Sequence, residues 1–190
     1  MSAEEAYAKI QAGQAALIKD FHVSKYYTWG DVLKSETIHP KYGPDRSKTI
    51  PLTTLINAQD FSKIVDKVSD SVGMKVPIES WVRVHDPKDK HPLPSNHIIG
   101  VAVDFKGKKE FLHDTVYNAV RRIPEIKGIG ESQPNWPEAG LHIDNGNGHM
   151  PPPGFQRWFI DNPGSKTGYG SPTILKIEPE TSKRNLDYQQ

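Results

Sequence analysis

Apolar residues recur at helical spacing in two long stretches of the chain. In residues 57–73, Asn57 can cap the start of a helix and Gly73 can end it. The inward positions of that helix are Phe61, Ile64, Val65, Val68 and Val72. Residues 110–123 show the same spacing, so the pattern predicts a second helix there.

The N-terminal segment also has a helical pattern, although its apolar positions are sparse. Ser2 and Glu5 have the spacing of a capping box, and the residues that follow are mostly good helix formers. We therefore expect a helix over residues 2–19. Because so few of its side chains are apolar, we expect residues 1–20 to form a helical arm outside the main domain.

Alternation of apolar and polar residues predicts strands. In residues 101–105 the apolar face consists of Val101, Val103 and Phe105, so Asp104 points the other way. In residues 140–145 the same alternation separates His142 and Asp144 from Leu141 and Ile143. The two predicted strands therefore each carry polar side chains on the face that turns away from the core.

A third strand is expected within residues 74–84, before a loop rich in proline. Breaker residues predict irregular backbone over 21–56 and again in the last third of the chain. Together these elements predict a compact α+β domain over residues 21–162, followed by a C-terminal extension over 163–190. We expect this domain to have a small, mainly antiparallel sheet with helices covering one face.

Composition narrows the classes of function. The chain has 190 residues with 24 Lys and Arg against 23 Asp and Glu, a net charge of +1, which predicts no nucleic-acid partner. It has no cysteine, so any metal must be bound by histidine and carboxylate. The first 21 residues lack the uninterrupted apolar core of a secretory signal or a membrane span.

Three residues have the chemistry of a metal site. Catalytic zinc sites have three protein ligands, often His with Asp or Glu, and keep one position for water. His97, Asp104 and His142 can supply such a set, because Asp104 and His142 share the polar face of the sheet and Gly100 lets the chain turn back after His97. Single polar residues on the exposed face of a sheet are also common, so the spacing alone leaves both interpretations open.

Sequence motifs favour the metal site. The stretch SNHIIGVAVD, residues 95–104, resembles the Ser-x-His-x-x-Gly-x-Ala-x-Asp element of the D-Ala-D-Ala carboxypeptidase-like zinc peptidases, whose fold is shared with the hedgehog signalling domain. Further resemblances to this family are FHVSKYY at 21–27, SWVR at 80–83, GIGESQPNWPEAGLHID at 128–144 and RW at 157–158. The chain is most similar to the small single-domain branch of phage lysis or tail proteins and bacterial cell-wall enzymes.

The resemblance implies a hedgehog/DD-peptidase-like fold with the zinc on one sheet face. It implies that Zn²⁺ is bound by His97, Asp104 and His142. It also implies that Arg83 holds the substrate carbonyl or the developing oxyanion. A surface ion pair between Arg83 and a nearby carboxylate is the alternative for that residue; its partners would be Glu79 or Asp86.

The general base departs from the family pattern. The position three residues before the second zinc histidine, which is Glu or Asp in the best-defined branches, is Ala139 here. We expect Glu138 to act as the acid/base, with a solvated loop carboxylate as the alternative. We expect Asp144 to assist catalysis by orienting His142. Ser95 and Trp136 are further candidates for contact with the substrate.

The predicted function is a zinc-dependent peptidase that hydrolyses an amide bond in peptidoglycan stem peptides or cross-links, as an endolysin or cell-wall hydrolase. Its partner would be the peptidoglycan peptide, reached from a phage virion or from the host cytoplasm upon release. The alternative is a structural or wall-binding protein of the phage tail or baseplate, which keeps the fold, contacts other virion proteins and has little turnover. A carbohydrate-binding module without zinc is a third interpretation.

Overall fold

The computed structural model of the chain describes residues 1–34, 46–84, 96–132, 139–146 and 156–160. Within these ranges the helical elements are α1 (Ala3–Gln11), α2 (Ala15–Ile18), α3 (Trp29–Val32), the 3₁₀ turn η2 (Ser47–Thr49), α5 (Leu52–Val72), η3 (Phe111–Val116) and α6 (Tyr117–Val120). The strands are β1 (Ile78–Ser80), β2 (Ala102–Gly107), β3 (Gly128–Ser132), β4 (Ala139–Asp144) and β5 (Gln156–Ile160).

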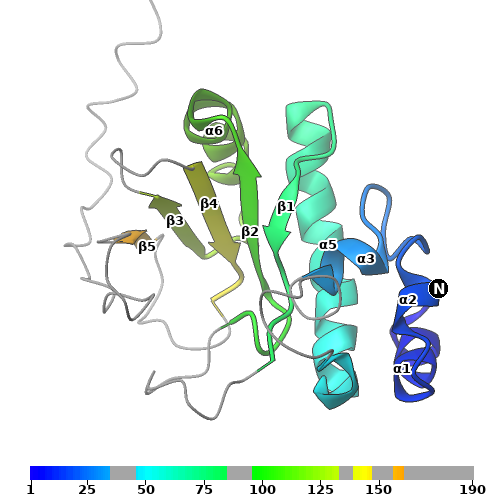
Figure 1. Cartoon of the computed structure of the whole chain (residues 1–190). Coiled ribbons are helices and arrows are strands. Elements are labelled where there is room, and N and C mark those ends of the chain that lie inside the picture. Colours follow the sequence, from blue (N-terminus) through cyan, green and yellow to red (C-terminus); the bar gives the residue numbers. More distant parts are fainter. Residues whose placement is uncertain (35–45, 85–95, 133–138, 147–155, 161–190) are drawn as a thin grey trace, which may run out of the picture.

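The five strands form one sheet in the order β1-β2-β4-β3-β5. The pairs β1–β2, β2–β4 and β3–β4 are antiparallel, whereas β3 and β5 are parallel. Helices lie behind this sheet (Figure 1), where α5 contacts both η3 and α6. The expected α+β architecture with a small, mainly antiparallel sheet is therefore confirmed.

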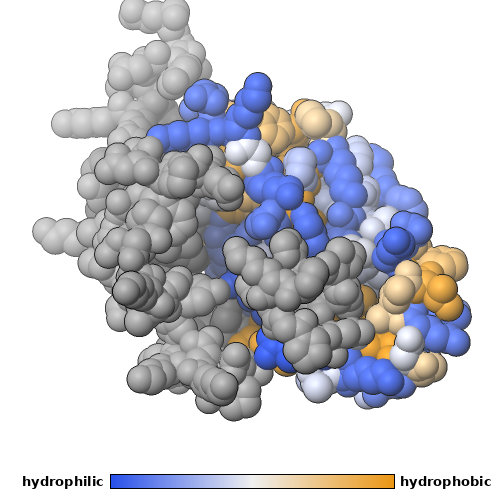
Figure 2. Space-filling view, in the orientation of Figure 1, coloured by the Kyte–Doolittle hydropathy of each residue, from blue (hydrophilic) through white to orange (hydrophobic). Residues whose placement is uncertain are grey.

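The two faces of the sheet differ in the way the alternation predicts. On the helical side Val103, Phe105, Leu141 and Ile143 are fully buried in the main hydrophobic core. Asp104 and His142 belong to the opposite face, and hydrophilic residues gather over β1 and β2 on the face that Figure 2 shows. Burial of the apolar set fixes the strand register, because a slip of one residue would turn these side chains outward.

The helix predicted over 57–73 begins earlier than expected. It starts at Leu52, directly after Pro51, whose φ of −65° already suits a helix start. The expected cap Asn57 instead lies inside α5, and its amide donates a hydrogen bond to the carbonyl of Ile99 at 3.0 Å. Gly73 ends the helix as predicted, with φ of +83°.

Part of the region expected to be irregular is also ordered into regular structure. Residues 21–56 contain α3, whose start is capped reciprocally by Thr28 and Asp31, and the first turn of α5. A helix of only four residues is too short to show apolar periodicity, so the pattern does not predict it despite the capping box. Residues 35–45 lie outside the described part of the chain.

The N-terminal segment packs on the domain. Ser2 and Glu5 form the predicted capping box, but the helix breaks near Gly13, where φ is +76°, and resumes as α2. Ala3, Ala6 and Ile10 are fully buried and belong to the same core as α5, which α1 contacts. Few apolar residues are enough because the spacing of Ala3, Ala6 and Ile10 puts them on one helical face, so the segment is not a separate arm.

Two other predicted elements are modified. The helix expected over 110–123 consists of a π-helical stretch, η3, followed by one turn of α-helix, α6. The strand expected within 74–84 is limited to Ile78–Ser80. The strands β3 and β5 fall where the alternation predicted none. None of the helices in the described ranges is long and apolar enough to cross a membrane.

Candidate metal centre

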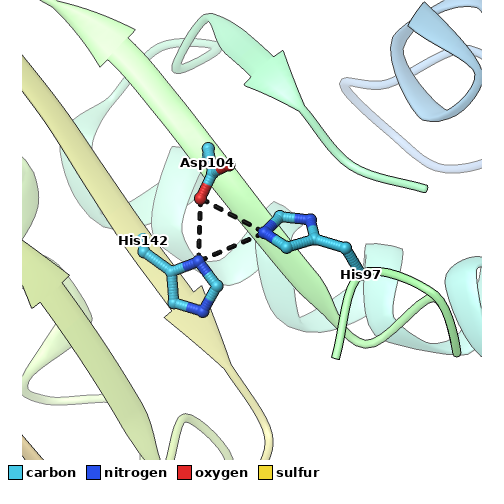
Figure 3. A group of neighbouring side chains, drawn as sticks. All are labelled: His97, Asp104 and His142. Carbon is cyan, nitrogen blue, oxygen red and sulfur yellow. Dashed lines mark hydrogen bonds and ion pairs between the residues drawn. The ribbon is translucent and has the colours of Figure 1, made fainter. Parts of the chain in front are cut away.

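The sheet places two of the predicted ligands opposite each other. Asp104 and His142 are register partners on the adjacent antiparallel strands β2 and β4. Cross-strand partners lie on the same face with their Cβ atoms about 5 Å apart, so their side chains meet. Figure 3 shows both side chains projecting from this face.

The third ligand comes from the turn before β2. His97 precedes Gly100, which has φ of +86° and whose position leaves no room for a side chain, because a Cβ there would lie 2.3 Å from the carbonyl oxygen of Thr54. The carbonyl of His97 accepts hydrogen bonds from the backbone N–H groups of Gly100 and Arg83, each at 3.2 Å. The turn therefore presses against α5 and aims the imidazole of His97 at the other two ligands (Figure 3).

The three donor atoms converge on one point, and two of the three distances between them are those of a tetrahedral metal site. Nε2 of His97 lies 3.3 Å from Oδ1 of Asp104 and 3.3 Å from Nδ1 of His142, and the last two atoms are 2.7 Å apart. Ligands at about 2.0 to 2.1 Å from a zinc ion in tetrahedral geometry lie roughly 3.3 Å from one another. The group of His97, Asp104 and His142 can therefore hold a metal ion.

Each predicted ligand also has a second polar side-chain atom, directed away from the site, that is hydrogen-bonded to the protein. Nδ1–H of His97 donates to the carbonyl of Trp81 at 2.6 Å, which leaves Nε2 directed at the site. Arg83 donates to Oδ2 of Asp104, so that Oδ1 faces the two histidines. Metal-binding histidines and carboxylates usually have such partners, which fix their orientation.

His142 has the most enclosed partner. Its Nε2–H donates to Oδ2 of Asp144 at 3.2 Å, and Asp144 is only 4% exposed. The other carboxylate oxygen accepts the N–H of Gly146 at 2.7 Å, and the side chain of Asn96 also hydrogen-bonds this carboxylate. This geometry fits the orienting role expected for Asp144.

The electrostatics of the metal-free site follow from burial and charge. Burial alone would raise the pKa of Asp104, but the neighbouring His97 and Arg83 charges hold that pKa well below its usual range. Burial lowers the pKa of His97. For His142 burial acts in the same direction, but hydrogen bonds to Asp104 and Asp144 outweigh it and raise the pKa to about 9.

Arg83 lies beside the triad formed by His97, Asp104 and His142. Its Nε–H donates to Oγ of Ser80 at 2.8 Å, and its guanidinium pairs with Asp104. Glu79, one of the alternative partners considered for Arg83, pairs with Lys106 at 3.0 Å. The side chain of Asp104 is 25% exposed, so solvent reaches the triad on this side.

Several predicted site residues lie outside the described part of the chain. They are Ser95, Trp136, Glu138 and Asp86. Trp81, which flanks the site in sequence, is fully buried in the core and contributes its carbonyl to His97. The sequence does not predict the supporting roles of Ser80, which accepts a hydrogen bond from Arg83, and of Asn96, which hydrogen-bonds Asp144. The available signal was proximity in sequence, because Ser80 lies three residues before Arg83 and Asn96 directly precedes His97.

Comparisons with protein-family models, with curated proteins and with solved structures found no match for this chain. The resemblance to zinc peptidases therefore depends on the motifs in the sequence. The metal-binding geometry depends on the residues themselves.

Proposed function

We propose that this protein is a zinc-dependent peptidase that cleaves an amide bond in the peptide part of peptidoglycan. The observation that carries the proposal is the geometry of His97, Asp104 and His142: their donor atoms all lie within 4.8 Å of one another, and their remaining polar side-chain atoms are hydrogen-bonded to the protein. The motifs that include these residues supply the reaction class and the substrate.

Zinc is the metal we propose for this donor set. Two imidazole nitrogens and one carboxylate oxygen, with solvent access to the fourth side, are the ligands typical of catalytic zinc. A zinc ion bound here would polarise a substrate carbonyl and lower the pKa of a bound water to about 7.

The residues of this chain supply the remaining parts of hydrolysis. Arg83, anchored by Ser80 and Asp104, holds a fixed positive charge beside the place where an oxyanion develops. Asp144 is buried and accepts hydrogen bonds at both carboxylate oxygens, so it suits orientation of His142 better than proton transfer. We assign the proton transfer to Glu138, which directly precedes β4.

Space beside the triad favours an extended substrate. Gly140 lies two residues before His142 on the same strand, and therefore on the same face. Among the described residues, a Cβ at Gly140 would meet only the carbonyl oxygen of Phe105, at 3.9 Å. The described part of the sheet surface next to His142 therefore carries no side chain at this position, which suits a peptide lying against it.

The test combines metal analysis with turnover. The purified protein is expected to contain about one zinc per chain and to release new amino groups from purified peptidoglycan. Chelation and His142→Ala should abolish that release, whereas His22→Ala, at an exposed histidine outside the site, should leave it unchanged. A protein that binds zinc but releases no amino groups would contradict the peptidase proposal.

One observation favours a second function. Ala139, the first residue of β4, stands where the best-defined peptidase branches have a carboxylate. A virion protein that uses the metal for stability or wall binding would have no need of that carboxylate. Such a protein would bind zinc and peptidoglycan without cleaving it, and it would be found in assembled tails or baseplates. Failure to take up any metal would instead favour the carbohydrate-binding module.

A further inference from the structure

The imidazole of His142 has two distinct environments. Nδ1 lies 2.7 Å from Oδ1 of Asp104 and 3.3 Å from Nε2 of His97, so it faces the proposed metal. Nε2 lies 3.2 Å from the carboxylate of Asp144 on the opposite side of the ring. His97 presents the other kind of nitrogen, Nε2, to the same point. The site therefore requires that the two rings be oriented differently.

The carboxylate of Asp144, which orients His142, occupies the space that a side chain at position 128 would need. Gly128 on β3 is the register partner of Asp144 on β4. A Cβ at Gly128 would lie 2.1 Å from Oδ2 of Asp144, 2.6 Å from its Cγ and 2.7 Å from its Oδ1. These distances are too short for any side chain, so even alanine at 128 would displace the carboxylate.

Asp144 has little freedom to move elsewhere. One of its oxygens accepts the N–H of Gly146 at 2.7 Å, and the side chain of Asn96 also hydrogen-bonds it. Gly146 itself has φ of +74°, a backbone conformation that residues with a side chain rarely adopt. The carboxylate of Asp144 is thus enclosed on one side by the turn at Gly146 and on the other by the backbone of Gly128.

We propose that Asp144, seated in the space left by Gly128, is a positioning residue that selects Nδ1 of His142 as the metal-binding nitrogen. In this proposal Gly128 is required for metal affinity although it contacts no ligand directly. Without the carboxylate, the ring of His142 can rotate and direct either nitrogen at the site. The inference rests on the proposed function only in requiring that His97, Asp104 and His142 bind the metal.

A matched pair of glycine variants tests the role of the space at residue 128. Zn²⁺ affinity is measured by competition with a chromophoric chelator for the wild type, Gly128→Ala and Gly140→Ala. Gly140 is also near the site, but among the described residues a Cβ there would meet only the carbonyl oxygen of Phe105, at the ordinary contact distance of 3.9 Å. We expect Gly128→Ala to lose about 10- to 100-fold in affinity, the loss typical of disturbing a partner of a metal ligand. Gly140→Ala should stay close to the wild type.

A double variant separates this role from general loss of stability. Asp144→Ala should weaken Zn²⁺ binding to a similar extent, and Gly128→Ala should then have no further effect, because the group it displaces is gone. If Gly128→Ala lowers Zn²⁺ affinity as much in the Asp144→Ala background as in the wild type, the proposal is overturned. Asp144→Asn serves as a second variant if Asp144→Ala fails to fold, and it too should weaken binding.

The orientation of the ring is measured directly by NMR. In the zinc-loaded wild type, the ¹⁵N signals of His142 should show Nε2 protonated and Nδ1 bound to the metal, and Asp144→Ala should mix the two arrangements. Binding through Nε2 in the wild type would overturn the proposal. If the wild type binds Zn²⁺ and Gly128→Ala binds it equally well, only this inference fails. If the wild type binds no Zn²⁺, the proposed function fails as well.

Discussion

The turn that carries His97 should tolerate no side chain at Gly100, and the cost of adding one can be worked out from the structure. Alanine at Gly100 would have to adopt φ of +86°, which costs roughly 1–2 kcal/mol for a residue with a Cβ. That Cβ would also lie 2.3 Å from the backbone oxygen of Thr54, which cannot rotate away. The backbone shift needed to relieve such overpacking costs a further 1–3 kcal/mol, roughly.

Gly73 provides the matched control for this substitution. Its φ is +83°, almost the same as that of Gly100, but no atom of the described residues lies within 4 Å of the place where a Cβ would be added. Gly73→Ala therefore pays only the conformational cost, and the effect of alanine on the unfolded chain is common to both variants. The difference between the two variants isolates the clash with Thr54.

The assay is urea unfolding of the metal-free proteins, with Zn²⁺ affinity as a second measurement. We expect Gly100→Ala to lose roughly 1–3 kcal/mol more unfolding free energy than Gly73→Ala. Because the turn aims His97 at the site, only Gly100→Ala should also weaken Zn²⁺ binding. Equal stability losses in the two variants would refute the steric reasoning, and unchanged Zn²⁺ affinity in Gly100→Ala would refute the link to His97.

Three further predictions concern the site and the core beside it. In the metal-free protein the pKa of His142 is raised from 6.5 to about 9, so its protonated ring stabilises the fold fully below pH 6.5, and this stabilisation is lost as pH rises through 9. The free energy of urea unfolding should therefore fall by an amount on the order of 3 kcal/mol between these pH values, and His142→Gln should abolish this pH dependence. Arg83→Ala should lower Zn²⁺ affinity by about 10- to 100-fold in a chelator competition, because Asp104 loses its ion pair with Arg83; unchanged affinity with lost turnover would contradict this supporting role and leave Arg83 only the oxyanion role proposed above. Trp81→Phe leaves the buried carbonyl of Gly100 without its indole donor at 3.2 Å, so unfolding free energy should fall by roughly 1–3 kcal/mol, and an unchanged urea midpoint would contradict this.

The face of the sheet on which Asp104 and His142 lie could be predicted from the sequence. Apolar residues alternate with Asp104 in one segment and with His142 in another, and burial of the apolar set forces both polar side chains to the same side. The pairing of these two residues across β2 and β4 could not be predicted in this way. Strand pairing depends on contacts between distant segments, which a local pattern does not contain.

Helix boundaries and supporting contacts were the least predictable features. Asn57 has the right chemistry for a cap, but Pro51 starts the helix earlier and Asn57 is used in a contact with Ile99. The pairing of Gly128 with Asp144 follows from the β3–β4 register, which no single segment specifies. Local preferences therefore predicted most of the helices and the strands β1, β2 and β4, and the motifs pointed to the candidate metal ligands, whereas tertiary packing decided where the elements begin and which groups support those ligands.

The pairing of Asp104 with His142 has a consequence for how a bound ion would leave. Both residues lie on interior strands, each hydrogen-bonded to a neighbour on both sides, and such strands open only in the rarest fluctuations of a fold. Their backbone amides should be among the slowest to exchange with deuterium. His97 lies outside this ladder on a turn, so dissociation would begin with its imidazole, and the lifetime of the complex would be set by the opening of that turn.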